Sequence, residues 1–386
     1  MADKKKGFAT RAVHAGQEPD PTTGAIMTPV YFTSTYVQAS PGVDKGYDYS
    51  RADHPTRKAL EGNLASLEGA KFGSAFASGL GAISSIMLCL KSGDDVVAGR
   101  DLYGGTYRLF EQVFQNFGLT FEFVDATNLK DIERSLTSKT KLLWLETPSN
   151  PLLQITDIAA ACKIAHKKGV QVAVDNTFAS PALQNPLELG ADLVVHSTTK
   201  YLGGHSDVIG GAVMTNSAEW HQRLHFMQKA VGATPGPMDC FLVLRGTKTL
   251  PLRMAKHCAT ARKLAALLRT NSEVAHVYYP GLPEHPGHVI AARQMKDFGG
   301  MLSFELKGDK ARAVRFLRKL KVFSLAESLG GVESLASHPA TMTHASIPRA
   351  AREKAGLRDT LVRLSIGVED YEDLLEDLTH AIKKSK

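Results

Sequence analysis

A lysine among hydroxyl side chains is the first candidate for chemistry in this sequence. An apolar run at 193–195 leads into Ser197, Thr199 and Lys200, and two glycines follow. Such hydroxyls can donate hydrogen bonds to a phosphate while the amine attacks a carbonyl group. A single lysine of this kind is more often a solvated surface residue. The residues around it must therefore decide between a reactive amine and a surface charge.

Two carboxylates close other apolar runs. Asp175 follows VQVAV, and Glu146 ends KLLWLE. A carboxylate in such a place is commonly a helix cap. It can also lie opposite a protonated pyridine nitrogen and keep it charged, which makes pyridoxal 5'-phosphate an electron sink. Both interpretations stay open for Asp175 considered alone.

A small-residue segment, FASGLGAISS, contains Ser78, Gly79 and Leu80 just before an expected helix. Backbone N–H groups at a helix N-terminus bind phosphate, although such a segment can also serve only to let a helix and a strand pack closely. A dinucleotide site is disfavoured because the third small residue of its motif is missing and the strand at 94–99 follows the glycines. No P-loop lysine is present either.

Tyr103, in DLYGGTYR, follows an expected strand. Its ring could belong to the core or stack on a flat cofactor ring. His285 and His288 have the spacing of metal ligands but no supporting carboxylates in a helix. We therefore interpret them as part of a polar loop and predict no metal site.

The elements that must position these residues alternate between strand and helix from about residue 55. This alternation predicts a mostly parallel central sheet that is covered on both faces, with ligands at the carboxyl ends of its strands. Strands are expected at 94–99, 121–125, 141–150, 170–178 and 191–200, and helices at 55–69, 106–118, 131–136 and 157–169.

The chain is too long for one simple core, so we expect two folded parts and an arm. Residues 1–50 alternate Pro, Gly, Thr and aromatics, which predicts an extended arm that lies on the body or on a neighbouring subunit. A first α/β domain is expected at 51–245. A smaller one is expected at 246–386, with a helix at 249–269 and strands at 299–308, 321–328 and 360–370.

Composition argues against several classes of protein. The chain has 43% hydrophobic and 22% charged residues and a net charge of +7, but no basic helix interleaved with aromatics, so nucleic-acid binding is disfavoured. The uncharged stretch at 72–90 has three glycines and four serines, which favours a loop entering a buried helix over a membrane span. The four scattered cysteines and the lack of an apolar leader predict a cytoplasmic protein.

Eight short motifs together resemble the Cys/Met-metabolism family of pyridoxal-phosphate enzymes. In order they are YSR, SGL, YGGT, ETPSNP, DNTF, STTKY, ESLGG and RLSIG. Any one of them is weak, whereas eight in register are specific, and the likeness runs from about His14 to the last helix. It implies fold type I, as in aspartate aminotransferase, with a pyridoxal-phosphate-binding domain at 51–245 and tetramers built from dimers that share active sites.

The resemblance implies a role for each matching position. Lys200 looks like the lysine that holds the cofactor and carries the proton, Asp175 like the partner of the pyridine nitrogen, and Tyr103 like the stacked residue. The remaining matches are Gly79, Leu80, Ser197 and Thr199 for the phosphate, Tyr49 and Arg51 reaching that phosphate from the adjacent subunit, and Asn150, Arg363 and Ser328 around the substrate carboxylate.

The reaction is suggested by three further positions. Glu327 matches an acidic residue of γ-lyases and γ-synthases that act on cystathionine, and Arg108 matches an arginine common to that subgroup. Gly105 stands where methionine γ-lyases carry a cysteine. We therefore expect a transsulfuration enzyme that cleaves L-cystathionine to L-cysteine, 2-oxobutanoate and ammonia.

Other functions remain open. They are a cystathionine γ-synthase that uses an O-acylhomoserine and cysteine, a cystathionine β-lyase, a methionine γ-lyase and a non-catalytic relative. Two positions depart from the family pattern. His54 replaces the asparagine of an NPT sequence near the expected phosphate clamp, and Asp48 stands where γ-lyases often have glutamate.

Overall fold

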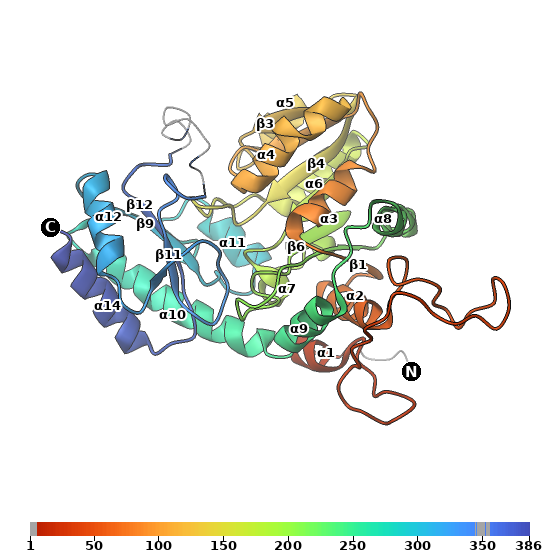
Figure 1. Ribbon diagram of the computed structural model, residues 1–386. Coiled ribbons are helices and arrows are strands. Elements are labelled where there is room, and N and C mark those ends of the chain that lie inside the picture. The colour runs from red at the N-terminus through yellow and green to blue at the C-terminus, as the bar shows by residue number, and fades with distance from the viewer. Residues whose placement is uncertain (1–5, 344, 346–351, 353–355) are drawn as a thin grey trace.

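The computed structural model describes residues 6–343, 345, 352 and 356–386, and this part of the chain forms two sheets surrounded by helices (Figure 1). The helices are α1 Phe8–His14, α2 Pro55–Glu68, α3 Gly79–Met87, α4 Gly104–Gln112, α5 Leu129–Ser135, α6 Ile158–Lys167, α7 Ser180–Leu183, α8 Ala218–Val231, α9 Pro237–Thr247, α10 Leu250–Thr270, α11 His288–Gln294, α12 Lys310–Lys319 and α14 Tyr371–Lys384, with short 3-10 turns at Phe114–Phe117 and Pro186–Leu189.

The larger sheet has the order β1-β7-β6-β5-β4-β2-β3. Its strands are β1 Phe72–Phe76, β2 Asp95–Gly99, β3 Thr120–Val124, β4 Thr140–Glu146, β5 Gln171–Asp175, β6 Leu193–Ser197 and β7 Gly211–Thr215. Strands β2 to β6 pair in parallel, and β7 runs antiparallel to both β6 and β1. The mostly parallel central sheet predicted from the alternation of strands and helices is thus confirmed.

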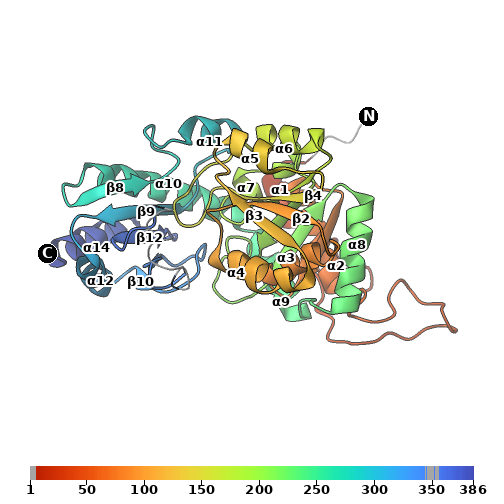
Figure 2. The same ribbon diagram turned by 90° about the horizontal axis from the view of Figure 1, so that it is seen from above.

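Both faces of this sheet are covered, which explains why its strands are apolar throughout. In β4, Leu142 and Trp144 pack with residues of α3, α4 and α8, whereas Leu143 and Leu145 pack with residues of α5 and α6. Because successive strand residues point to opposite faces, the run KLLWLE contributes to both layers. Figure 2 shows α3 and α4 on one side of β2 and β3, and α5 and α6 on the other.

The smaller sheet has the order β10-β11-β12-β9-β8. Its strands are β8 Val274–Tyr278, β9 Met301–Leu306, β10 Ser324–Leu325, β11 Leu335–Ser337 and β12 Leu361–Ser365. Apolar residues of α10, α12 and α14 form one buried cluster with β9 and β12. These helices therefore provide the hydrophobic cover that this sheet needs.

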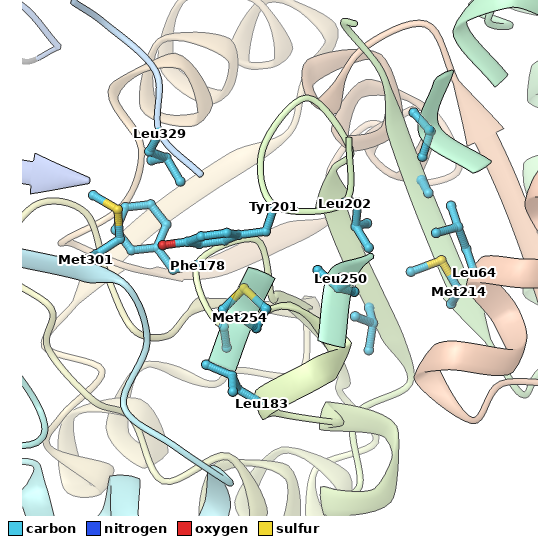
Figure 3. Close-up of a cluster of buried hydrophobic side chains, with 14 of the residues drawn as sticks. Leu64, Phe178, Leu183, Tyr201, Leu202, Met214, Leu250, Met254, Met301 and Leu329 are labelled. Atoms are coloured by element: carbon cyan, nitrogen blue, oxygen red, sulfur yellow. The ribbon is translucent and has the colours of Figure 1, made fainter. Parts of the chain in front are cut away.

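A third buried cluster joins the two sheets next to the predicted reactive lysine. Tyr201, which follows Lys200 in the chain, is 1% exposed and belongs to this cluster. Figure 3 shows its ring among Phe178, Met254 and Met301, which come from the loop after β5, from α10 and from β9. The backbone at Lys200 is thus anchored where the two parts of the molecule meet.

Three segments differ from the expected elements. Residues 72–90 contain strand β1 before helix α3, rather than only a loop and a helix. The helix expected at 106–118 begins at Gly104, ends at Gln112 and is followed by a 3-10 turn capped by Gly118. The strand expected at 321–328 is reduced to Ser324–Leu325. The domain boundaries at 50 and 245 stay a prediction.

The N-terminal arm is not extended throughout. It begins with α1, which packs against α2 and α10, and the residues between α1 and α2 then form long loops that project from the body (Figures 1 and 2). Many of these loop residues are exposed, including Ile26, Phe32 and Val37. No helix in the described ranges has the length and apolar character needed to cross a bilayer.

His54 closes the arm and begins α2 as its N-cap. Its Nδ1 accepts a hydrogen bond from the Arg57 N–H, its Nε2 lies 2.8 Å from the Tyr31 carbonyl oxygen, and Pro55 follows at the first helical position. Burial lowers the pKa of His54, which favours the neutral ring that can accept at Nδ1 and donate at Nε2. The histidine therefore performs the capping task for which asparagine is also suited.

Candidate active site

The carboxyl ends of three neighbouring strands meet at one place. Glu146 ends β4 and pairs in register with Asp175 at the end of β5, and Asp175 pairs with Val195 of β6, two residues before Ser197. The hydrogen bond from the Ser197 N–H to Thr177 Oγ1, at 2.9 Å, continues the connection between β5 and β6 beyond the ladder. Parallel pairing thus gathers polar groups from distant parts of the sequence at one edge.

A cavity of about 340 Å³ opens at this edge, a volume typical of small-molecule sites. Eleven of the predicted site residues line it: Gly79, Leu80, Tyr103, Asn150, Asp175, Ser197, Thr199, Lys200, Glu327, Ser328 and Arg363. The fold therefore brings together residues that are spread over more than two hundred positions of the chain.

Lys200 projects its amine towards the second sheet. Its Nζ donates a hydrogen bond to Ser328 Oγ at 2.7 Å. Burial lowers the pKa of Lys200 to about 8, with the Arg363 charge acting in the same direction and Glu327 opposing it. An amine with such a pKa has a much larger neutral fraction near physiological pH than an ordinary lysine, and this neutral form can attack a carbonyl group or accept a proton.

Arg363, on β12, is 2% exposed, and its guanidinium forms part of the cavity wall. Its Nη1 donates to Asn150 Oδ1 at 2.8 Å and its Nη2 donates to the Ser328 carbonyl oxygen at 2.9 Å. Within the described residues its Nε has no hydrogen-bond partner. A buried guanidinium that keeps a free donor is suited to a carboxylate ligand.

The start of α3 fits a phosphate group. Ser78 Oγ accepts from the Gly81 N–H at 3.0 Å, so the Gly79 and Leu80 amides remain without a partner inside the helix. A Cβ at Gly79 would lie 3.0 Å from the Ser197 Cβ, so any side chain there would crowd Ser197 and force it to shift. Gly79, Leu80 and Ser197 all line the cavity, and backbone N–H groups at a helix N-terminus bind phosphate.

Asp175 fits the nitrogen of a protonated pyridine ring. It is 9% exposed, its Oδ1 accepts from the Thr177 N–H at 3.0 Å, and burial raises its pKa. A buried carboxylate is stabilised by a cation, and a pyridinium nitrogen would supply that charge. With Lys200 and the phosphate cradle, the residues present thus fit pyridoxal 5'-phosphate.

Tyr103 is the N-terminal cap residue of α4 and lies beside this place. A Cβ at Gly105 would approach the Tyr103 ring to 2.3 Å. A cysteine at this position, which the methionine γ-lyase pattern requires, would therefore have to displace the ring from the place it has here.

Three predicted site residues do not line the cavity of this chain. Arg108 is exposed on α4. Tyr49 and Arg51 are exposed on the arm, with the Arg51 guanidinium carbon 5.4 Å from the centre of the Tyr49 ring. The contribution of Tyr49 and Arg51 to another subunit stays a prediction.

Some residues of the site were not predicted. Thr177 belongs to the DNTF motif but was given no role. It lines the cavity, its N–H donates to Asp175 Oδ1, and its Oγ1 accepts from the Ser197 N–H. Glu146 had no assigned role, and the hydrogen bond between Lys200 and Ser328 could not be read from the sequence. Ser328 has a φ of 91°, an unusual backbone conformation for serine, and such strain often occurs at functional sites.

Comparisons with known proteins identify the family of this chain. A family model described as Cys/Met metabolism PLP-dependent enzyme matches residues 9–383. The chain is 53% identical to a cystathionine beta-lyase of Coxiella burnetii over 98% of this chain and 99% of that protein. It is 50% identical to a cystathionine gamma-lyase of Dictyostelium discoideum, covering 98% of each.

A solved structure of cystathionine gamma synthase from Xanthomonas oryzae, in complex with cystathionine, covers 99% of both chains at 46% identity and a TM-score of 0.97. Three different names therefore occur among relatives of nearly equal similarity, so the names alone do not select one reaction. The family model, in contrast, covers residues 9–383 and names the cofactor. The chain therefore belongs to the family of Cys/Met-metabolism enzymes that depend on pyridoxal phosphate.

Proposed function

We propose that this enzyme is a cystathionine γ-lyase, which converts L-cystathionine and water to L-cysteine, 2-oxobutanoate and ammonia. One observation carries the proposal: the same cavity contains the Lys200 amine, the Arg363 guanidinium and the Glu327 carboxylate. A substrate with carboxylate and ammonium groups matches these charges. The relative from Dictyostelium discoideum that bears this name supports the assignment.

Pyridoxal 5'-phosphate, when bound, supplies an electron sink for the charge that develops as protons leave the substrate carbons. Gly79, Leu80, Ser197 and Thr199 would hold its phosphate, Asp175 its ring nitrogen, and Lys200 its aldehyde carbon. Tyr103 would cover one face of the ring.

The remaining groups orient the substrate and move its protons. Arg363, held by Asn150, binds the α-carboxylate through its free donor capacity. The Lys200 amine takes the proton from the substrate Cα, which a pKa of about 8 allows at neutral pH. Ser328, whose Oγ accepts from the Lys200 Nζ, positions this amine once the substrate has released it. A second proton then leaves Cβ, the Cγ–S bond breaks, and the departing sulfur takes up a proton to leave as cysteine.

Cystathionine γ-synthase is the second candidate, favoured by the likeness to the Xanthomonas oryzae synthase. The two reactions share an unsaturated intermediate, so the same residues serve both. Purified enzyme should be supplied first with cystathionine alone and then with O-succinylhomoserine plus cysteine. The γ-lyase proposal predicts 2-oxobutanoate in the first assay, and its absence there together with cystathionine in the second would establish the synthase.

We further propose a homotetramer, a dimer of dimers, in which Tyr49 and Arg51 complete the phosphate site of the adjacent subunit. The exposed position of both residues on a projecting arm supports this, as does the exposed apolar character of Ile26 and Phe32. Sedimentation analysis should give four times the 41.7 kDa chain mass. A monomer with full activity would contradict shared sites.

We also propose a cytoplasmic location, since Cys89, Cys162, Cys240 and Cys258 are all free and buried. Cell fractionation should place the protein with cytoplasmic markers, and recovery with an exported fraction would contradict this.

A further inference from the structure

Glu146 is a buried carboxyl group in the cavity to which the reaction assigns no task. It is 8% exposed and stands directly opposite Asp175 in the register of β4 and β5. Two acidic side chains thus lie side by side at the same ends of adjacent strands. A pyridinium ring brings one positive charge to this place, so only one of the two carboxyl groups can be balanced by it.

The Glu146 carboxyl also connects two segments of the cavity wall. Its Oε2 accepts a hydrogen bond from the Tyr103 N–H at 2.8 Å, and the Asn150 backbone amide lies near enough to the same carboxyl to lower its pKa. Asn150 in turn accepts from Arg363. One side chain therefore ties the segment that carries the stacking ring to the segment that supports the carboxylate-binding arginine.

The electrostatic surroundings favour a neutral Glu146. Burial raises the pKa of Glu146 well above its usual range, and the neighbouring Asp175 and Asp101 act in the same direction. The backbone amides of Tyr103 and Asn150 oppose this rise only in part. The pKa of Asp175 is also raised by burial, but its hydrogen bonds from Thr177 and the charge of His196 oppose the rise. Of the two carboxyl groups, Asp175 is thus the better anion.

We propose that Glu146 is a positioning residue, which fixes Tyr103 and Asn150 around the cofactor ring and, as a neutral acid, leaves Asp175 as the single anion facing that ring. The proposal rests on the assignment of pyridoxal phosphate to this cavity. It does not depend on which substrate the enzyme cleaves.

The test compares two variants of the holoenzyme. Glu146→Gln is neutral and keeps one acceptor oxygen, whereas Glu146→Leu has a similar size and no acceptor. The readouts without substrate are the visible absorbance of the bound cofactor, its pH midpoint, and its circular dichroism, which reports how the ring is held. The kinetic readouts are kcat and KM for cystathionine.

Glu146→Gln should keep the pH midpoint of the cofactor absorbance and most of its dichroism, and lose no more than about fivefold in kcat. Glu146→Leu should still bind the cofactor, lose most of the dichroism, and lose about 100-fold in kcat, because small misplacements of reacting groups are that costly. Asp175→Asn provides the reference for a lost anion and should lower the pH midpoint.

A matched control uses Glu122, an exposed acid on β3 of the same sheet. Glu122→Gln and Glu122→Leu should leave all readouts unchanged. Should Glu146→Leu not fold, Glu146→Met, which also lacks acceptors, takes its place.

A downward shift of the midpoint in Glu146→Gln, like that of Asp175→Asn, would overturn the neutral state. Unchanged dichroism and kcat in both the leucine and methionine variants would overturn the positioning role. If the wild-type protein shows no cofactor band, the cofactor assignment fails instead, so the two failures are distinguishable.

Discussion

Lys200 owes its reactivity to opposing charges around a buried amine. Burial and Arg363 lower its pKa, while Glu327 raises it, and the result is about 8. The neutral amine is the form that accepts a proton, so kcat should rise as the pH increases through this range. The negative charge of Glu327 raises the pKa of Lys200 and thereby the pH at which the amine becomes neutral.

Glu327→Gln removes the negative charge that stabilises the protonated amine. The rising limb of the pH profile of kcat should therefore move to lower pH, whereas the wild-type limb should lie near pH 8. Steady-state rates across pH 6–10 check this. A limb that stays in place or moves to higher pH in the variant would show that Glu327 does not act on Lys200.

The sequence predicted those site residues whose chemistry depends on their type. For Lys200, Asp175 and Arg363, the order of the family's motifs argues against a purely structural role as the explanation of the residue type. All three line the cavity. Glu146 could not be assigned a role because its partners are the backbone amides of Tyr103 and Asn150, which any residue type provides. Only strand register and loop folding bring these groups together.

At the scale of elements, the phosphate cradle depends on the close approach of α3 and β6. Gly79→Ala would place a Cβ 3.0 Å from the Ser197 Cβ, so the helix start or the strand end must shift. We expect the dissociation constant of pyridoxal phosphate to rise about tenfold, because the amides no longer converge on the phosphate.

Equilibrium titration of the apoenzyme with the cofactor measures this change. Gly7→Ala is the control, because among the described residues, its chain neighbours aside, no atom lies within 4 Å of the Cβ added there. Equal affinities for Gly79→Ala and the wild type would show that the phosphate does not bind at the start of α3.

A buried polar network holds α2 beneath the ends of β5 and β6. Glu68 Oε1 lies 2.6 Å from His196 Nε2 and accepts from Asn176 Nδ2 at 2.9 Å, and the three residues are at most 1% exposed. Asn176 and His196 are the chain neighbours of Asp175 and Ser197. The network therefore supports the strand ends that carry the site.

Glu68→Ala leaves these buried partners unsatisfied and should lower the free energy of unfolding by about 3 kcal/mol. Chemical denaturation measures the change. Glu219→Ala, on the exposed face of α8, is the control and should change the free energy by less than about 0.5 kcal/mol. A loss in Glu68→Ala as small as in the control would exclude a supporting role for the network.

The elements that the sequence predicted best are the parallel strands, because burial on both faces makes them continuous apolar runs. Strand β1 was missed because its sequence, FGSAF, contains glycine and serine and gains its ladder only from β7, more than 130 residues later. Strand β10 was predicted too long because its register with β11 covers only Ser324 and Leu325. Pairing between distant segments decided both cases.

At the scale of the whole molecule, the cavity exists only because the two sheets meet. Lys200 follows β6 of the first sheet, whereas Arg363 lies on β12 of the second and Ser328 in the loop between β10 and β11. The interface cluster around Tyr201 fixes this arrangement (Figure 3). Two folded parts and an arm could be expected from the chain length and from the change of residue pattern along the chain. The hydrogen bonds across the interface depend on how the two parts pack.

Shared active sites can be tested by subunit complementation. Lys200→Ala and Arg51→Ala should each be almost inactive alone. In hybrids of the two variants, one kind of site combines an intact Lys200 with an intact Arg51 from the other subunit, so activity should return. Mixtures that stay as inactive as the parent variants, although hybrids have formed, would contradict a contribution of Arg51 across the interface.

The most direct test of the γ-lyase assignment identifies the keto acid formed from L-cystathionine alone. Cleavage at Cγ yields 2-oxobutanoate, whereas cleavage at Cβ yields pyruvate. We predict that mass spectrometry will find 2-oxobutanoate as the main keto acid, and that Lys200→Ala will form neither. Pyruvate as the main product would contradict the account and identify the enzyme as a β-lyase.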